Sequence, residues 1–597
     1  MPCYTVNQHS IQILLSWIQA GQIAIPEIQR PFVWSGSQVR DLIDSLYRGY
    51  PVGYLIAWQS PNVRLRSGEN SSGRQILIDG QQRVTALMAA VLGHRIINNH
   101  YQKIRVRIAF HPLDEKFEVT NPAIEKNSAW LPDITSVLAD GSRVFDLANQ
   151  YLSKNPETDQ AEVFERIQRL RNILNNQIGF ISLNSDLDIE EVTEIFIRIN
   201  AKGKVLSQAD FIMSKIAANE SYGGHDLRKL IDYFCHLCTL PEDFDAIQTQ
   251  DIDFANTSLF QKLSWLKDTK DDLYNPEYTD VLRVAFVSEF GRGRLRDLVA
   301  LLSGRDFEKR TYEEVIAEDS FAKLQKSVLS VVSQTHFQRF LMILRSAGII
   351  DPALIGSVNV VNYAYVVYLL LKKDNFPPEQ IESYVRRSYV LNILAERFAG
   401  NPEGTFDFDI RRINSEGFGT YFQGLEDSLL SMTFWGIALP QKLRTSSASS
   451  PFFRLFRAAQ VKANDKGFLS KAITVRDMIL HRGDRHHIYP KQHLIRLGYR
   501  QSEYNQIANY ALTQSEINIQ ISDTAPEVYF AELVNQCSGG SQTYGAVIDR
   551  AELESNLEEN CIPTYMLDKD KVPNYETFLS DRRHLMAQKI KCYYEGL

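Results

Sequence analysis

The chain has 597 residues, of which 44% are hydrophobic, 23% charged and 11% aromatic, and its formal net charge is −7. This composition is typical of a soluble protein, and the length is too great for a single hydrophobic core, so we expect three or four domains. No apolar run reaches the ~18 residues that a membrane helix needs. The best candidate, residues 357–371, carries two asparagines and three tyrosines, so we expect no membrane span.

The N-terminus, MPCYTVNQHS, has no charged segment followed by an apolar block. We therefore expect no secretory signal and a cytoplasmic protein. Six cysteines are too few for a disulfide framework. Cys235 and Cys238 have a CxxC spacing, but no second pair of ligands stands near them in the sequence, which argues against structural zinc.

Positive charge is concentrated in residues 441–500, which hold 13 Lys or Arg against three Asp. A basic segment inside an acidic chain indicates binding to a polyanion, because phosphate neutralisation releases counterions and dominates the affinity. Docking of this segment onto the acidic part of the same chain explains the charge equally well.

Strand-like runs alternate with amphipathic helices up to about residue 110, whereas residues 185–440 have mostly helical spacing. The polar run 445–451 fits a linker. We predict a helix-rich, multidomain α+β chain with an α/β domain at 1–220, a helical middle at 221–440 and a third domain at 441–597 that ends in a helix. The helical middle has no motif that we can tie to chemistry, and self-association into a homo-oligomer stays open.

A first group of polar residues falls where a predicted strand ends and a predicted helix begins. The group consists of Asp79, Gln81, Gln82 and Arg83, with Gly80 at the break. A helix N-terminus offers unpaired N–H groups to phosphate, and Arg83 adds a planar fork of donors. The glutamines can orient a water or a ligand hydroxyl. Asp79 could hold Mg²⁺ or a ribose, or it could cap the helix.

Two further segments carry polar residues of the same kinds. Arg30 follows Gln29 and precedes a proline, which favours an extended backbone and leaves the Arg30 side chain free to reach a ligand. Asn200 ends a predicted helix, where asparagine is often only a C-cap, and Ser207 is predicted to cap the next helix. Spacing alone does not establish a nucleotide site, since none of these segments is a Walker loop or a GxGxxG motif.

The segments IPEIQRPFVW, LIDGQQR and FIRINAKGKVLS, in this order, resemble the N-terminal domain of the GmrSD-type, modification-dependent restriction endonucleases, which is a ParB/sulfiredoxin-like domain. The resemblance implies binding and hydrolysis of a nucleoside triphosphate, with GTP, ATP, CTP and UTP not distinguished. It assigns nucleotide binding to Gln29, Arg30, Asp79, Gln81, Gln82, Arg83 and Asn200.

A second group lies in and after the basic segment. His486 and His487 stand in DRHHIYP, and Asn518 follows downstream. We predict a strand with the histidines, a second strand from residue 509 and a helix capped by Thr513 and Glu516 that carries Asn518. This order is typical of a ββα metal fold, in which phosphodiester hydrolysis needs a general base and one divalent cation. A solvent-exposed or capping histidine pair is the alternative.

The run from His487 to Pro490 resembles the HIxP core of HNH endonucleases, and Asn518 lies nine residues past Asn509, as in many members. The resemblance makes His487 the general base, His486 and Asn518 ligands of Mg²⁺ or Mn²⁺, and Asn509 the residue that fixes the loop or the base. Members often have aspartate at the position of His486. A neutral ligand there weakens Mg²⁺ binding and favours Mn²⁺ or a softer ion.

Together, these patterns predict a nucleotide-dependent DNA endonuclease of the anti-phage restriction type, which cuts double-stranded phage DNA that carries modifications. A rival from another class is a ParB-like, nucleotide-switched clamp that binds DNA and has an inactive nuclease domain. A third interpretation keeps the nuclease and lets the N-terminal domain bind nucleotide without hydrolysing it.

Overall fold

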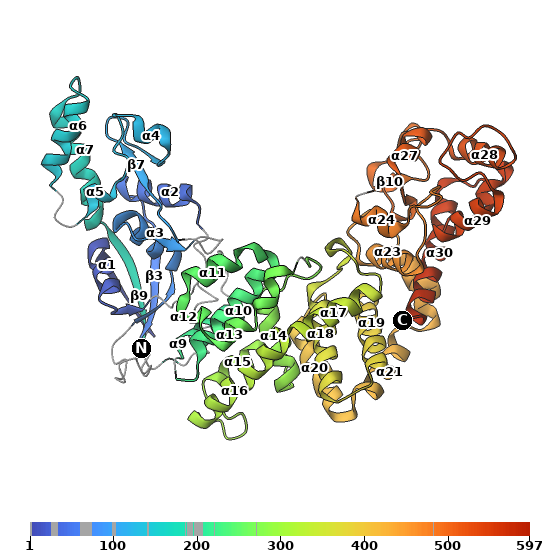
Figure 1. Cartoon of the computed structure of the whole chain (residues 1–597), viewed down its shortest axis with the longest axis horizontal. Helices are drawn as coiled ribbons and strands as arrows, with labels where there is room; N and C mark the ends of the chain where they lie inside the picture. The colour runs from blue at the N-terminus through green and yellow to red at the C-terminus, as the bar shows by residue number, and fades with distance from the viewer. Residues whose placement is uncertain are drawn as a thin grey trace. The chain divides into compact units, whose positions relative to one another are not determined.

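The computed structural model describes residues 3–24, 34–59, 75–97, 103–139, 143–184, 187, 195, 207–219, 221–269, 271–481 and 483–597. Contacts divide the chain into two compact units, the first made of residues 1–270 with 295–325 and the second of residues 271–294 with 326–597. Helices dominate both units, and small sheets accompany them (Figure 1), so the predicted helix-rich α+β class is confirmed. The division into domains at residues 220 and 440 stays a prediction.

A five-stranded mixed sheet with the order β1-β9-β3-β4-β2 lies in the first unit. Strand β3 is central, because it pairs parallel with β9 and antiparallel with β4, while β1 adds antiparallel to β9 and β2 parallel to β4. The strands are β1 Tyr4–Ser10, β2 Ile23–Ala24, β3 Tyr54–Gln59, β4 Gln75–Asp79 and β9 Gln177–Leu183.

Helices α1 (Ile11–Gln19), α2 (Gly36–Tyr47) and α3 (Gln81–Val91) share one core with this sheet. The apolar residues of α2 recur at helical spacing and are all buried, as the sequence predicts. The helix ends before Gly49, whose φ of 74° is one that glycine adopts without strain. Because both β4 and α3 contribute buried residues to this core, the core holds the connection between them in place.

The remaining described elements of the first unit surround or follow the sheet. Ser207 caps α9 through a capping box with Asp210, as predicted. The elements are β5 Ile96–Ile97, β6 Lys103–Ile104, β7 Ile108–His111, β8 Lys116–Val119, α4 Pro122–Lys126, α5 Thr135–Leu138, α6 Val144–Lys154, α7 Gln160–Asn172, η1 Ile173–Asn175, α9 Gln208–Ala218, α10 Gly224–Thr239, η2 Pro241–Asp243, α11 Phe244–Gln250, α12 Ile252–Ala255, α13 Ser258–Gln261, η3 Ser264–Asp268 and α15 Leu295–Leu302.

The second unit begins as a set of packed helices, and α16 (Glu314–Val331) enters it from the first. The helices are α14 Tyr278–Phe290, α17 Gln334–Ser346, α18 Val358–Lys373, α19 Pro378–Leu394, α20 Pro402–Glu416, α21 Phe418–Leu429 and α22 Leu439–Lys442, with the short turns η4 Pro352–Leu354 and η5 Phe434–Ala438. The apolar run at residues 357–371 forms α18. Among the described helices, none combines the length and hydropathy needed to cross a bilayer.

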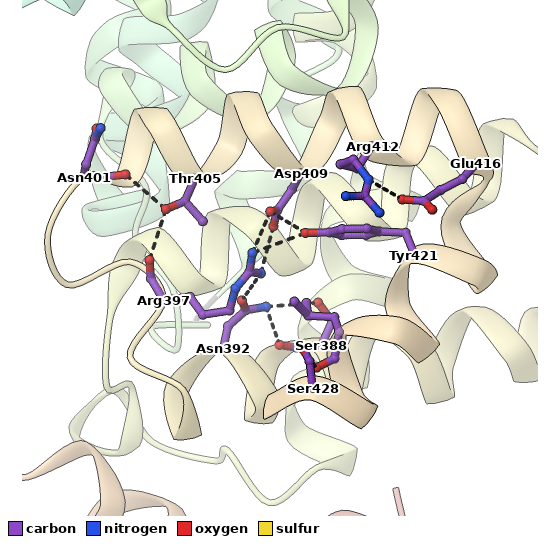
Figure 2. Close-up of polar contacts among 11 residues, drawn as sticks. Ser388, Asn392, Arg397, Asn401, Thr405, Asp409, Arg412, Glu416, Tyr421 and Ser428 are labelled. Atoms are coloured by element: carbon purple, nitrogen blue, oxygen red, sulfur yellow. Dashed lines mark hydrogen bonds and ion pairs between the residues drawn. The ribbon is translucent and has the colours of Figure 1, made fainter. Parts of the chain in front are cut away.

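A buried polar cluster joins α19, α20 and α21 (Figure 2). The Arg397 guanidinium donates two hydrogen bonds to the Asp409 carboxylate, at 2.8 and 2.6 Å, and a third to Asn392 Oδ1 at 2.9 Å. The Tyr421 hydroxyl also donates to Asp409, at 2.5 Å. Asp409 is fully buried, so its charge is compensated by directed donors rather than by water.

The last part of the second unit carries the antiparallel pair β10 (Asp484–His487) and β11 (Tyr510–Thr513), followed by α27 (Ser515–Ile521). The other elements are α23 Pro451–Ala463, α24 Val475–Leu480, α25 Lys491–Arg496, α26 Gln501–Tyr504, η6 Ile507–Asn509, α28 Pro526–Cys537, α29 Arg550–Glu559, η7 Thr564–Leu567, η8 Lys569–Lys571 and α30 Tyr575–Glu595. The predicted strand–strand–helix order and the C-terminal helix are confirmed.

The predicted capping box at Thr513 and Glu516 is wrong. Thr513 is the last residue of β11, and its hydroxyl donates to the Phe468 carbonyl at 2.7 Å. Helix α27 instead follows Gln514, which makes no side-chain cap. Thr513 is fully buried. Its hydroxyl is therefore satisfied by the Phe468 carbonyl and not by an amide of α27.

Candidate active sites

The turn between β4 and α3 depends on Gly80, which has a φ of 95°. A side chain there would also clash, because a Cβ atom would lie 2.3 Å from Cδ2 of Leu55. Glycine at this position lets the buried strand pass directly into the helix. Asp79 is thereby placed at the end of β4, and Gln81 and Gln82 lie in the first turn of α3.

Arg83 is held at this turn by two contacts. Its Nη1 donates to the Tyr54 carbonyl at 2.6 Å, and its Nη2 lies 3.5 Å from Oδ2 of Asp79. Gln81 Nε2 donates to the Leu77 carbonyl at 3.2 Å. The helix starts at Gly80 without a side-chain cap, so Asp79 is oriented by Arg83 and does not act as the cap. The structure therefore brings Asp79, Arg83 and the two glutamines together beside a helix N-terminus.

The other three residues predicted to bind nucleotide, Gln29, Arg30 and Asn200, lie outside the described residues. Their predicted role stays a prediction.

The ββα motif of the second unit brings the second predicted group together. In β10, His486 is buried and its neighbours Arg485 and His487 are more exposed, as the alternation of a strand requires. His486 Nδ1 lies 2.9 Å from Asn518 Oδ1 on α27. Asn518 Nδ2 in turn lies 3.4 Å from Oδ2 of Asp484. One strand and one helix thus present a ring nitrogen, an amide and a carboxylate at one place.

Burial keeps His486 neutral. Only 2% of the residue is exposed, and burial lowers the pKa of its imidazole to about 4, while the bond to Asn518 opposes this change. The ring stacks on Phe468 with centroids 5.5 Å apart. Its Nε2 atom is buried and has no hydrogen-bond partner among the residues that the structure describes. The imidazole is therefore a neutral nitrogen donor over the whole physiological pH range.

His487 lies on the opposite face of β10 and is only partly buried. Its Nε2 lies 3.0 Å from Oδ1 of Asn505. Burial lowers its pKa, Asn505 opposes this, and the nearby Lys491 and Arg485 lower the pKa further. Asn505 was not predicted from the sequence, because it belongs to no motif and reaches His487 only through the packing of α25 and α26 between them.

Asn509 is fully buried and fixes the loop that follows the histidines. Its Oδ1 accepts a hydrogen bond from the Tyr489 amide at 2.8 Å. Its Nδ2 donates to the carbonyls of Tyr489 and Tyr504, at 3.0 and 3.2 Å. Of the two roles predicted for Asn509, the contacts are those of a loop residue, and the contact to the predicted base comes from Asn505 instead.

The Asn518 oxygen can only accept a hydrogen bond, so Nδ1 of His486 carries the proton and the lone pair of the ring lies on the buried Nε2. These two side chains could hold a small divalent cation only if this proton moved to Nε2; their 2.9 Å separation is close to the roughly 3 Å between adjacent octahedral ligands with bonds of about 2.1 Å. Asp484 adds a carboxylate beside them. Within the described part of the chain, no three His, Cys, Asp or Glu side chains gather in a metal-binding arrangement. A cation at this place would therefore rely on an amide oxygen and on water.

One known family matches the N-terminal part of the chain. Residues 11–217 match the GmrSD restriction endonuclease, N-terminal domain. The match includes the β4–α3 turn, and it supports a restriction endonuclease of the GmrSD type, as the three sequence segments predict. It ends well before the ββα motif. A comparison with curated proteins found no match for the chain.

Proposed function

We propose that the chain is a nucleotide-dependent DNA endonuclease of the anti-phage restriction type, and that residues 484–521 cut double-stranded phage DNA that carries modifications. The observation that carries this proposal is the β10–β11–α27 motif, which combines a neutral His487 with the His486–Asn518 donor pair. The GmrSD match supports the restriction class and makes DNA the expected partner.

His487 has the geometry of a general base. The Asn505 oxygen can only accept a hydrogen bond, so Nε2 of His487 carries the proton and Nδ1 keeps its lone pair. That lone pair takes the proton of the attacking water. The lowered pKa keeps the imidazole free to accept this proton at neutral pH. Asn505 fixes both the tautomer and the direction of the ring.

His486 and Asn518 would hold Mg²⁺ or Mn²⁺, with Asp484 as the nearest carboxylate. When bound, the cation supplies positive charge for the oxyanion that leaves in phosphodiester hydrolysis. Burial keeps the His486 ring neutral, but Nδ1 carries its proton in the hydrogen bond to Asn518, so metal binding through Nδ1 would require that proton to move to Nε2. A neutral nitrogen in place of a carboxylate favours Mn²⁺ over Mg²⁺.

The β4–α3 turn would bind the phosphates of a nucleoside triphosphate. The first amides of α3 point out of the helix N-terminus, and Arg83 is held beside them by Tyr54 and Asp79. Gln81, Gln82 and, from the segments outside the described residues, Gln29, Arg30 and Asn200 would complete the site. We expect the triphosphate to be hydrolysed there. Under the alternative interpretation, in which the N-terminal domain binds nucleotide without hydrolysing it, phosphate release from the parent protein and from Arg83→Ala should be equal and negligible.

The test of the proposed nuclease is DNA cleavage by the full chain, with Mg²⁺ or Mn²⁺, with and without each triphosphate, on matched modified and unmodified DNA. Loss of the general base in His487→Ala should slow cleavage by about 10²- to 10⁴-fold. His481→Ala is the matched control, because His481 is exposed and lies outside the ββα motif. Equal cleavage by the parent and His487→Ala would refute the assignment.

The rival clamp, a nucleotide-switched DNA-binding protein with an inactive nuclease motif, predicts a different outcome. DNA would be bound in a nucleotide-dependent way and would stay intact with every metal. The lowered pKa of His487 and its contact with Asn505 favour the nuclease, because a binding module has no use for an oriented, neutral base.

A further inference from the structure

Two cations flank His487. Arg485 alternates with His486 along β10 and so lies on the same face of the strand as His487. Lys491 is the first residue of α25, four positions past His487. After burial and the opposing Asn505, both cations contribute to the lowered pKa of His487, so both are close enough for their charges to act on it. Their side chains are exposed.

Aromatic rings fix the positions of these cations without neutralising them. The Arg485 guanidinium lies 5.5 Å from the ring centre of Tyr510, and this ring lies 5.0 Å from that of His487. The Lys491 ammonium lies 5.7 Å from the ring centre of Tyr504, which lies 6.4 Å from that of His487. Cation–π contacts of this kind hold the side chain while its charge stays available to a ligand.

A third cation, Arg457 on α23, extends the group. Its guanidinium lies 4.4 Å from the ring centre of Phe453, which is packed 6.2 Å from Tyr510. Its Nε atom is buried and finds no hydrogen-bond partner within the described segments. Burial, together with the charges of Arg485 and Arg454, lowers the pKa of Arg457 to about 10. Arg457 and Arg485 are thus like charges near each other, one of them partly desolvated.

In the described residues, no carboxylate lies within ion-pair distance of Arg457, Arg485 or Lys491. Other cations of the same region have such partners, as Arg496 has Asp523 and Arg550 has Glu554. An unpaired, partly buried cation next to another cation costs free energy, and a bound anion removes that cost. Guanidinium groups match the oxygens of phosphate in geometry.

We propose that Arg457, Arg485 and Lys491 form a phosphate cradle that binds consecutive backbone phosphates of a DNA strand and holds that strand across His487. The placement at a cutting site rests on the proposed nuclease function. The binding of phosphates rests on the three cations alone, and it is measured without cleavage.

The test is binding of a fluorescent DNA duplex by the full-length His487→Ala protein in EDTA, measured by anisotropy over a range of salt concentrations. Each of the substitutions Arg457→Gln, Arg485→Ala and Lys491→Ala should weaken binding about tenfold. Each should also reduce the slope of log K against log salt by about 0.9, the value for one lost phosphate contact on duplex DNA. Arg550→Ala, which removes an exposed and paired cation, should leave the slope unchanged.

The two proposals fail in different ways. Slopes of the three variants equal to the parent slope would overturn the cradle, even if His487→Ala abolishes cleavage. If the parent protein never cuts DNA but the three variants still show reduced slopes, the proposed phosphate cradle is supported and the proposed nuclease function is refuted. Arg485 and Lys491 are exposed, so their variants should unfold at the parent's temperature, and a slope change in them is then a loss of DNA contact.

Discussion

Two arginines of the second unit are both removed from water, and their surroundings differ completely. Arg397 is tied to Asp409, Asn392 and Tyr421, so every charge in that cluster has a directed partner (Figure 2). Arg457 packs on Phe453 with Arg485 and Arg454 nearby, and it has no carboxylate partner among the described residues. The first arrangement is complete without a ligand, whereas the second leaves a charge that an anion can compensate.

This difference helps to distinguish cations that stabilise the fold from cations that are available to a ligand. The distinction is useful here because the family match covers only residues 11–217. Positive charge alone does not locate a DNA site, since paired cations also occur near the ββα motif. The cations without a carboxylate partner gather around His487, the proposed base, on the face of β10 opposite to the His486–Asn518 pair. The coincidence of an uncompensated charge with a potential catalytic group is what favours an active site.

The largest expected effect on stability is at the Arg397 cluster. Asp409→Ala leaves the Arg397 guanidinium buried without its carboxylate and should lower the free energy of unfolding by about 3–5 kcal/mol. Arg457→Gln removes a charge that has no carboxylate partner in the described part of the chain and should change that free energy by less than about 1 kcal/mol. Urea denaturation of both variants measures this contrast. Equal losses would show that Arg457 is as structural as Arg397.

A second expected effect is a loss of stability in acid that depends on His486. The pKa of this imidazole is about 4 in the folded protein against 6.5 for an unperturbed histidine. Above pH 6.5 His486 is neutral in both the folded and the unfolded chain, and its full contribution to the free energy of unfolding is present. This contribution falls as the pH drops towards 4, because His486 binds a proton more tightly in the unfolded chain than in the folded one. The loss amounts to about 3 kcal/mol. Denaturation of His486→Phe at pH 7 and pH 4.5 should show a smaller loss than the parent, while His481→Ala should behave like the parent.

The sequence predicted those elements whose determinants are local. The apolar spacing of α2, the Gly80 break before α3, the Ser207 cap of α9 and the order of β10, β11 and α27 are all present. The Thr513 cap failed because tertiary contact with Phe468 takes the hydroxyl. Asn505 escaped prediction because it belongs to no motif and reaches His487 only in the folded chain. Charge counting found the basic segment but could not tell its paired cations from its unpaired ones.

A smaller effect is expected at Asn505, which is hydrogen-bonded to His487, the proposed general base. Asn505→Ala should reduce single-turnover cleavage about tenfold, the value of one oriented hydrogen bond. It should also move the acid limb of the pH–rate profile to lower pH, because Asn505 raises the pKa of His487. Asn505→Asp should restore the ring orientation and move that limb to higher pH. A change in rate with an unmoved limb in both variants would assign Asn505 a structural role only.

The smallest expected effect is electrostatic. Arg485→Gln and Lys491→Gln each remove a positive charge that lowers the pKa of His487, so the acid limb of cleavage should move to higher pH in both. Arg550→Gln should leave the limb in place. Low salt should enlarge the movement, since the two side chains are exposed and their charges are screened by ions. A limb that moves equally in all three variants would contradict this assignment.

The most direct measurement of the central claim is the pH–rate profile of single-turnover DNA cleavage, with Mn²⁺ and saturating nucleotide, by the parent protein and His487→Ala. We expect cuts whose rate rises with pH to a plateau, with a midpoint below 6.5, and a loss of about 10²-fold or more in the variant. Intact DNA at every pH while phosphate is released from the nucleotide would contradict it and would favour the DNA-binding clamp.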